Sequence, residues 1–228
     1  MNDLAQKLIE ELQCETVFTI PVLGGIPVSE AVVVTWIIMA VLVIVAFILT
    51  RNLKVDHISK RQAVAESIVT GLTNMVQGMV GEKGRKYVPY LTTVMLYIGV
   101  SNIIGLFGFK SPTKDLRVTV ALALMSIILI EAAGIYHKGV KRWLHGFVEP
   151  VAIVTPINIL EVVTKPLSLC MRLFGNVLGA FVIMELLKMI LPVGLPVVFS
   201  LYFDIFDGLL QAYVFVFLTS LYIDEITE

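Results

Sequence analysis

The chain of 228 residues is 57% hydrophobic and 15% charged, and its mean hydropathy is +0.90. This composition excludes a soluble domain of average makeup and indicates an integral membrane protein. The formal net charge of -1 gives no sign of a nucleic-acid partner or of a broadly basic lipid-binding face.

Residues 1–30 are predicted to form an extracytoplasmic N-terminal segment. They begin without the basic stretch and the apolar run of a secretory signal peptide, so we expect the first hydrophobic helix to stay in the protein. Cys14 lies before that helix, and Cys170 lies inside a later apolar run. We therefore expect two unpaired cysteines and no structural disulfide.

Long uncharged runs predict the first three membrane helices. Residues 31–50 carry no charge over twenty positions and residues 87–109 carry none over twenty-three, so each run can cross a hydrocarbon core of about 30 Å as a helix. Residues 118–136 form a third span that is interrupted only by Glu131. The segment 51–86, rich in Lys, Arg, Gln and Gly, predicts a cytoplasmic or interfacial helix between the first two spans.

Two further membrane helices are predicted at 166–191 and 197–223. The turn LPVGLP between them, rich in proline and glycine, predicts a hairpin. The preceding segment 137–165 is predicted to be a cytoplasmic connection, in which two prolines break residues 147–164 into an interfacial or re-entrant approach. Together the elements predict an all-α integral membrane protein with about five transmembrane helices in one domain. No internal repeat is apparent, which argues against inverted-repeat transporters.

The distribution of basic residues predicts the orientation in the membrane. Seven Lys and Arg residues follow the first span, and His137, Lys138, Lys141 and Arg142 follow the third. Because basic residues concentrate in cytoplasmic loops, both connections are expected inside the cell. The N-terminus is then expected outside and the C-terminus in the cytoplasm.

Arg172 is a cation inside an apolar helix, with no acidic residue close to it in the sequence. An arginine at the centre of a membrane helix costs roughly 2.5 to 3.5 kcal/mol, so such residues usually serve an ion path or a polar partner. Snorkelling is the alternative, since Lys165 at the expected cytoplasmic end lies only about 10 Å away along the helix. The side chains that share its face are mostly small or polar: Ser168, Gly175, Asn176, Gly179 and Ile183. This face predicts either close helix packing or the approach of an acidic partner helix.

Three polar residues mark one face of the last helix. Asp204, Asp207 and Gln211 stand at i, i+3 and i+7 in a segment otherwise rich in Leu, Phe, Tyr and Val. Two acids and an amide on one face of a membrane helix predict a water-accessible path for ions. The alternative is that the two aspartates only cap the outer end of a helix that begins near position 204.

Antiparallel pairing of the last two helices brings further polar residues to this path. A hairpin that turns near Gly194 sets Glu185 opposite about position 203 and Asn176 opposite about position 212. The three carboxylates then gather toward the outside, with the amides between them and Arg172, a layout that suits the passage of protons. Glu185 also stands three residues before Lys188, so a structural ion pair is the alternative for this acid.

The string KPLSLCMRLFGNVLGAF, with PINILE before it and LLQAYVFVFLTSLYI after it, closely resembles subunit a of the F-type ATP synthase. The stretch SNIIGLFGFKSPTKDLRVTVALAL is also similar to that family. The resemblance implies that Arg172 is the family's essential arginine, Asn176 the asparagine one turn on, and Gln211 the glutamine near that arginine. It also implies a strongly tilted hairpin of the last two helices against a rotating c-ring, and two aqueous half-channels separated by Arg172.

The resemblance further implies the setting of the protein. Its partners would be the c-ring, subunit b of the peripheral stalk and the other ATP synthase subunits, in the inner membrane of a bacterial cell. It implies no cofactor, no nucleic acid and no resident metal, and the carried ion would be the proton or sodium. The sequence holds no phosphate loop of the G-x-x-x-x-G-K-[ST] type, so the chain would be no enzyme by itself. A secondary ion-coupled transporter and a membrane scaffold are the alternative function classes.

Two positions depart from the family pattern. Phe181 stands where many members have a glutamate, and Asp204 stands where many have a histidine. Glu185, one helical turn after Phe181, is a candidate for the displaced acid, whereas Asp207 has no counterpart in the pattern. The roles of these three acids are therefore expected from their placement and not from the resemblance.

Overall fold

The computed structural model describes residues 16–20, 26–51, 59–107, 109, 111–147, 152–190 and 194–227. Its strands and helices, in chain order, are β1 (Thr16–Ile20), β2 (Ile26–Ser29), α2 (Glu30–Thr50), α3 (Lys60–Met79), α4 (Val88–Ile103), α5 (Leu116–Lys138), α6 (Val140–Gly146), α7 (Thr155–Ile190), α8 (Leu195–Ser200) and α9 (Gly208–Thr227). Short 3-10 turns lie at Glu82–Tyr87, Ile104–Phe107, Pro112–Lys114 and Ala152–Val154, and a π-helical segment, Leu201–Asp207, joins α8 to α9.

Five helical stretches in the described residues are long and apolar enough to cross a membrane, so the prediction of an all-α membrane protein is confirmed. They are Glu30–Thr50, Gly84–Phe107, Leu116–Lys138, Thr155–Met189 and Val198–Thr227. The antiparallel pair β1–β2 adds a small sheet before the first of them. The sidedness of the spans and the tilt of the last two against a ring stay predictions.

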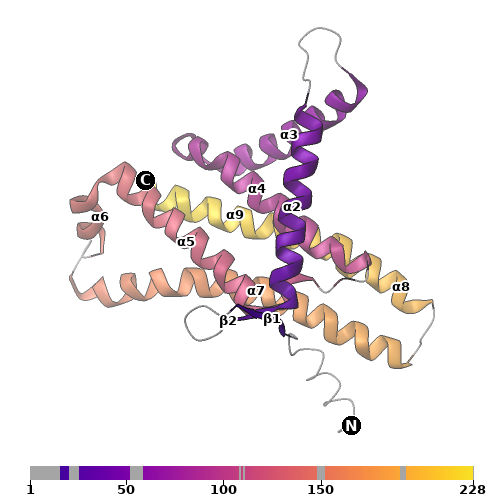
Figure 1. Ribbon diagram of the computed structural model, residues 1–228. Coiled ribbons are helices and arrows are strands. Elements are labelled where there is room, and N and C mark those ends of the chain that lie inside the picture. The colour runs from indigo at the N-terminus through magenta and orange to yellow at the C-terminus, as the bar shows by residue number, and fades with distance from the viewer. Residues whose placement is uncertain are drawn as a thin grey trace.

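Helices α4, α5, α7 and α9 form most of the packed core, and Ala31 of α2 and Val76 of α3 join it. Helix α4 packs along α9, and α5 packs along both α7 and α9, while α2 crosses this group at a steep angle (Figure 1). Most of the contacts between the helices are apolar, and several core side chains have an exposed fraction of 1% or less: Leu91, Ile98, Ile130, Phe215 and Val216. Most of α2 beyond Ile38 is instead exposed and apolar, as at Val43 and Phe47. Such a surface suits contact with lipid.

Helix α7 begins at Thr155, which corrects the predicted start near Pro166. Residues 155–164 continue the helix instead of forming a broken approach. Pro156 stands in the first turn, where a backbone N–H has no helical acceptor in any case. Pro166 lies inside the helix, and membrane helices tolerate such a proline when neighbouring groups compensate for the missing N–H. The entry of this segment into the membrane stays a prediction, and Pro150 lies outside the described residues.

A buried polar cluster fixes the start of α9 against α4. The Asn102 amide donates to the Gly208 carbonyl (3.0 Å) and accepts from the Thr113 hydroxyl (2.8 Å). The Ser111 hydroxyl donates to the Ser101 carbonyl (2.7 Å). Asn102 is only 5% exposed, so these hydrogen bonds satisfy groups that water does not reach. Because Gly208 directly follows the π-helical segment, the cluster determines where the acids of that segment lie.

The cysteine prediction is confirmed for Cys170, which is a free and buried thiol. Its Sγ lies 3.5 Å from Thr119 Oγ1, where α7 packs on α5. Cys14 lies outside the described residues.

Candidate functional site

A cavity of about 330 Å³ lies between α7 and the π-helical segment that leads into α9. We call it the Asp207 cavity. Five of the six site residues predicted from the sequence line it: Asn176, Glu185, Asp204, Asp207 and Gln211. The structure thus brings these five side chains together, and their roles stay predictions. Arg172, the sixth, does not line this cavity.

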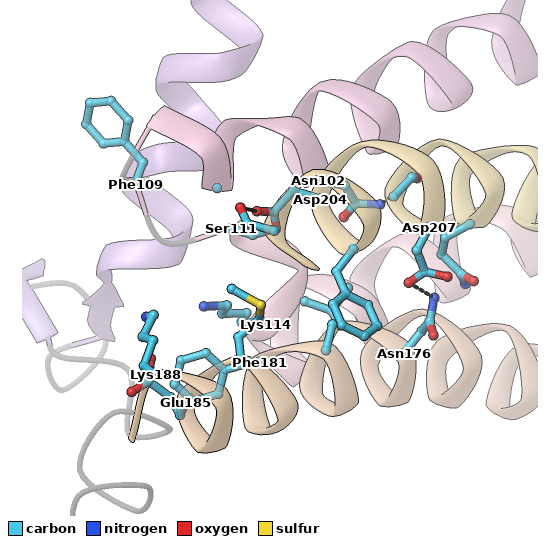
Figure 2. A pocket seen from close by; sticks show the side chains of 18 residues that line it. Asn102, Phe109, Ser111, Lys114, Asn176, Phe181, Glu185, Lys188, Asp204 and Asp207 are labelled. Carbon is cyan, nitrogen blue, oxygen red and sulfur yellow. Dashed lines mark hydrogen bonds and ion pairs between the residues drawn. The ribbon is translucent and has the colours of Figure 1, made fainter. Parts of the chain in front are cut away.

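Glu185 lies at one end of the Asp207 cavity, beside Lys188, whereas Asn176 and Asp207 lie at the other end (Figure 2). Lys188 Nζ is 2.6 Å from Glu185 Oε1, so the ion pair expected as an alternative for Glu185 is present. The Lys188 side chain is more than half exposed. Pairs of this kind contribute at most about 1 kcal/mol to stability because water screens them. The pair therefore neutralises the charge of Glu185 without holding the cavity shut.

Asp204 and Asp207 each accept a hydrogen bond from a neighbouring side chain. Asn176 Nδ2 donates to Asp207 Oδ2 (2.7 Å), which connects α7 to the end of the π-helical segment (Figure 2). Ser200 Oγ donates to Asp204 Oδ2 (2.7 Å). The helical run already begins at Leu195, so the alternative in which the aspartates cap a helix starting near position 204 is wrong.

The π-helical segment Leu201–Asp207 changes the register of these acids. Its hydrogen bonds run from residue i to i+5, so each residue turns through a smaller angle than in the α-helix assumed from the sequence. Asn176 contacts Asp207, which stands before the expected position 212 in the chain. Single π turns inside α-helices are frequent at functional sites, and the sequence pattern carried no signal for this one.

Gln211 lies buried in the wall of the Asp207 cavity. Its side chain is 3% exposed, and within the described residues its Nε2 atom has no hydrogen-bond partner. Leaving such a donor unpaired costs roughly 1 to 3 kcal/mol. A buried polar group retained at this cost calls for an explanation beyond packing, and a functional role is one such explanation.

Lys114 is a cavity residue that sequence reasoning missed. It belongs to the turn Pro112–Lys114, and its Nζ atom lies 4.0 Å from the centroid of the Phe181 ring (Figure 2). A cation over an aromatic face is attracted by about 0.5 to 2 kcal/mol, depending on exposure. The two residues are far apart in the sequence and follow no shared motif, so only the tertiary structure reveals the contact.

Arg172 lies on the exposed surface of α7. Its neighbours Leu169, Cys170 and Leu173 are buried against the rest of the chain, so the guanidinium faces away from the core. In the part of the chain that the structure describes, Arg172 makes no ion pair and no hydrogen bond. Its charge is therefore available to a neighbouring subunit or to lipid headgroups.

A second cavity, of about 310 Å³, lies where the ends of α5 and α9 meet α6 and the first half of α7. We call it the Glu131 cavity. Its charged lining residues are Glu131, Lys138, Arg142, Glu161, Lys165 and Glu225. Lys165 Nζ is 3.0 Å from Glu225 Oε2, and Trp143 Nε1 donates to Glu131 Oε2 (2.9 Å). Sequence reasoning missed this cavity because its walls come from four separate segments.

The two cavities lie on either side of Arg172 along α7. The last α7 residue that lines the Glu131 cavity is Lys165, and the first that lines the Asp207 cavity is Asn176. At 1.5 Å per residue, Arg172 stands about 10 Å beyond Lys165 and about 6 Å before Asn176. Along α7, Arg172 thus lies between the residues that line the two cavities.

Comparison with known proteins places the chain in a family. Residues 32–224 match the ATP synthase A chain family. This chain belongs to that family. It is 36% identical to ATP synthase subunit a of Moorella thermoacetica, over 88% of this chain and 92% of the relative. It is 35% identical to the sodium ion specific ATP synthase subunit a of Propionigenium modestum, over 87% and 74% of the two chains, and 34% identical to ATP synthase subunit a 1 of Chlorobaculum parvum, over 90% and 91%.

Membership of the ATP synthase A chain family confirms the resemblance that the RLFGN string and the later Q-A-aromatic string suggested. The chain is therefore a membrane subunit of the ATP synthase, with roles in ATP synthesis and ion transport. This membership favours that function over a secondary transporter or a scaffold. Among the described residues, no group of three or more His, Cys, Asp or Glu side chains is arranged to hold a metal ion.

Proposed function

We propose that this chain is the stator ion channel of an F-type ATP synthase, with two half-channels that lead to and from the carboxylates of a c-ring. The observation that carries the proposal is the pair of cavities on either side of Arg172. The Asp207 cavity opens to the outside and the Glu131 cavity to the cytoplasm, as the distribution of basic residues supports. The partners are the c-ring, subunit b and the other synthase subunits, in a bacterial inner membrane.

Arg172 supplies the permanent charge between the half-channels. A ring carboxylate that arrives at the guanidinium is held ionised by a charge-assisted attraction, so it gives up its ion to one half-channel. After rotation, the carboxylate reloads from the other half-channel. Without the cation, ions would cross between the cavities without turning the ring. The exposure of Arg172, with no partner in the described part of its own chain, supports contact with a neighbouring subunit.

The polar residues of the Asp207 cavity form the path between the outside and the ring. The acids precede the amides along this path: Glu185, Asp204, Asp207, Asn176 and Gln211. The hydrogen bond from Asn176 to Asp207 joins the innermost acid to the helix that carries Arg172. The lysine and aromatic ring at Lys114 and Phe181 stand in the wall of this path. Ions taken up at the exposed end thereby reach the level of Arg172.

Opposite-sided access to the two cavities tests the proposal. Phe203 lines the Asp207 cavity and Val162 lines the Glu131 cavity. In assembled complexes that lack the native cysteines, we expect Phe203→Cys to react with a membrane-impermeant thiol reagent only from the outside. Val162→Cys is expected to react only from the cytoplasmic side. Mass spectrometry of oriented vesicles measures the labelling of both cysteine variants, and the cysteine-free chain is the control. Labelling of both positions from the same side would contradict the proposal.

We propose the proton as the carried ion, with sodium as the alternative. Each acid of the Asp207 cavity already accepts a bond from a protein donor, which leaves fewer oxygens to replace the hydration shell of a metal cation. We therefore expect ATP hydrolysis by the purified complex to be independent of sodium at neutral pH. Potassium at equal ionic strength is the control. Stimulation by sodium alone would identify sodium as the carried ion.

A further inference from the structure

Glu131 is an acid within the span Leu116–Lys138, and the proposed function leaves it without an individual role. An ionisable residue inside a membrane helix is costly and therefore a candidate for function. Glu131 lies about 10 Å of helix rise before Lys138, at the end of α5. The charged groups that share its cavity come from every element around it: Lys138 on α5, Arg142 on α6, Glu161 and Lys165 on α7, and Glu225 on α9.

The contacts of Glu131 suit a group that gains and loses a proton. Its carboxylate accepts a hydrogen bond from the neutral indole N–H of Trp143 at 2.9 Å, and it pairs with no cation in the described part of the chain. Glu225, in contrast, forms an ion pair with the ammonium of Lys165 at 3.0 Å. Glu161 stands on the exposed first half of α7. Among the described acids of this cavity, Glu131 is thus the one that is partly buried and forms no ion pair.

We propose that Glu131 is the proton acceptor of the Glu131 cavity and that Trp143 is its positioning residue. The proposal rests on the proposed function and adds the residue through which protons leave the ring. An acid of the ring loses its proton to water, a Glu131 oxygen gains one from that water, and the proton then passes to water on the cytoplasmic side. Only O–H bonds form and break. Helix α6 folds back beside the end of α5, which brings the Trp143 indole to the carboxylate (Figure 1).

Three substitutions separate this role from a structural tie between α5 and α6. Glu131→Gln keeps an acceptor for the Trp143 N–H and removes the titratable group. Trp143→Phe removes the N–H and keeps the carboxylate, and Glu131→Asp keeps the carboxylate on a shorter side chain. Potential-driven proton flow through the assembled membrane sector in vesicles measures each variant, and Glu82→Gln, an exposed acid outside both cavities, is the matched control.

We expect Glu131→Gln to slow proton flow about 10- to 100-fold, at the low end of proton-transfer effects because water carries part of the flow. Glu131→Asp and Trp143→Phe are expected to stay within about threefold of the parent chain, since both retain a carboxylate at the cavity. Normal flow in Glu131→Gln would overturn the proposal. A loss in Trp143→Phe that equals or exceeds the loss in Glu131→Gln would also overturn it, because Trp143→Phe keeps the carboxylate and breaks only the bond between α5 and α6. Either failure leaves the thiol-access test of the two cavities untouched, so the two proposals fail separately.

Discussion

Replacing Arg172 with alanine is expected to abolish ion-driven ATP synthesis while the complex still assembles. The guanidinium is exposed on α7 and makes no ion pair or hydrogen bond in the described part of its own chain. Its removal therefore breaks no hydrogen bond or ion pair among the described residues. A charge pair at 4 Å in partly polar surroundings is worth about 4 kcal/mol, which corresponds to a loss of at least a hundredfold in rate. ATP synthesis by inverted vesicles, with complex assembly checked on native gels, measures the effect.

The Arg172→Lys variant tests what the guanidinium adds to its charge. Lysine keeps the cation but loses the planar fork that binds a carboxylate through two hydrogen bonds. We expect slow synthesis in this variant, between the alanine variant and the parent chain. Arg61→Ala removes an exposed cation from α3 and is expected to have no effect. Synthesis at the normal rate in Arg172→Ala would contradict the proposed function.

Replacing Gly208 with alanine is expected to loosen α9 from α4. A Cβ atom at position 208 would lie 2.8 Å from the Cβ of Asn102, so one helix must move. Overpacking of this kind costs about 1 to 3 kcal/mol, and the better helix propensity of alanine returns about 1 kcal/mol. The net loss of up to about 2 kcal/mol should lower the thermal midpoint by up to about 8 °C for a chain of this size. Thermal unfolding of the purified subunit in detergent measures it.

Replacing a matched glycine, Gly78, is expected to have the opposite effect on the thermal midpoint. A Cβ atom at Gly78 on α3 would meet no atom within 4 Å, so Gly78→Ala should raise the midpoint slightly through helix propensity. Gly208→Ala should also slow ATP synthesis, because the Asn102 bond to Gly208 sets the position of the adjacent Asp207. Equal midpoints for the two alanine variants would show that α4 and α9 are not held by this close approach.

Periodicity and turn chemistry were enough to predict the long apolar helices and the grouping of Asn176, Asp207 and Gln211. The runs without charge predicted the helices, and the expected pairing of the last two helices predicted that their polar residues would share one cavity. The family resemblance singled out Arg172, and helical spacing gave its distance from Asn176. The predictions of the helices and of the grouping succeed because they depend on local spacing and on residue type, whereas the role of Arg172 stays a prediction.

The inferences that failed depend on contacts between distant segments. Pro166 looked like a helix start, but neighbouring helices let α7 continue through it. The π-helical segment has no marker in the sequence, so the register of Asp204 and Asp207 could not be predicted. The Lys114 contact with Phe181 and the bond from Trp143 to Glu131 join residues whose proximity only the packed structure creates.

A single helix, α7, borders both cavities, and this gives the proposed stator a direction. Lys165 toward its N-terminal end borders the cytoplasmic compartment, and Asn176 toward its C-terminal end borders the outer one under the proposed orientation. Under the proposed function, a rotor acid that has just emptied into the cytoplasmic side travels along α7 from its N-terminal to its C-terminal part before it refills. Driving the motor backwards with ATP reverses this travel. In this proposal, the chain direction of α7 therefore determines the direction in which the ring rotates.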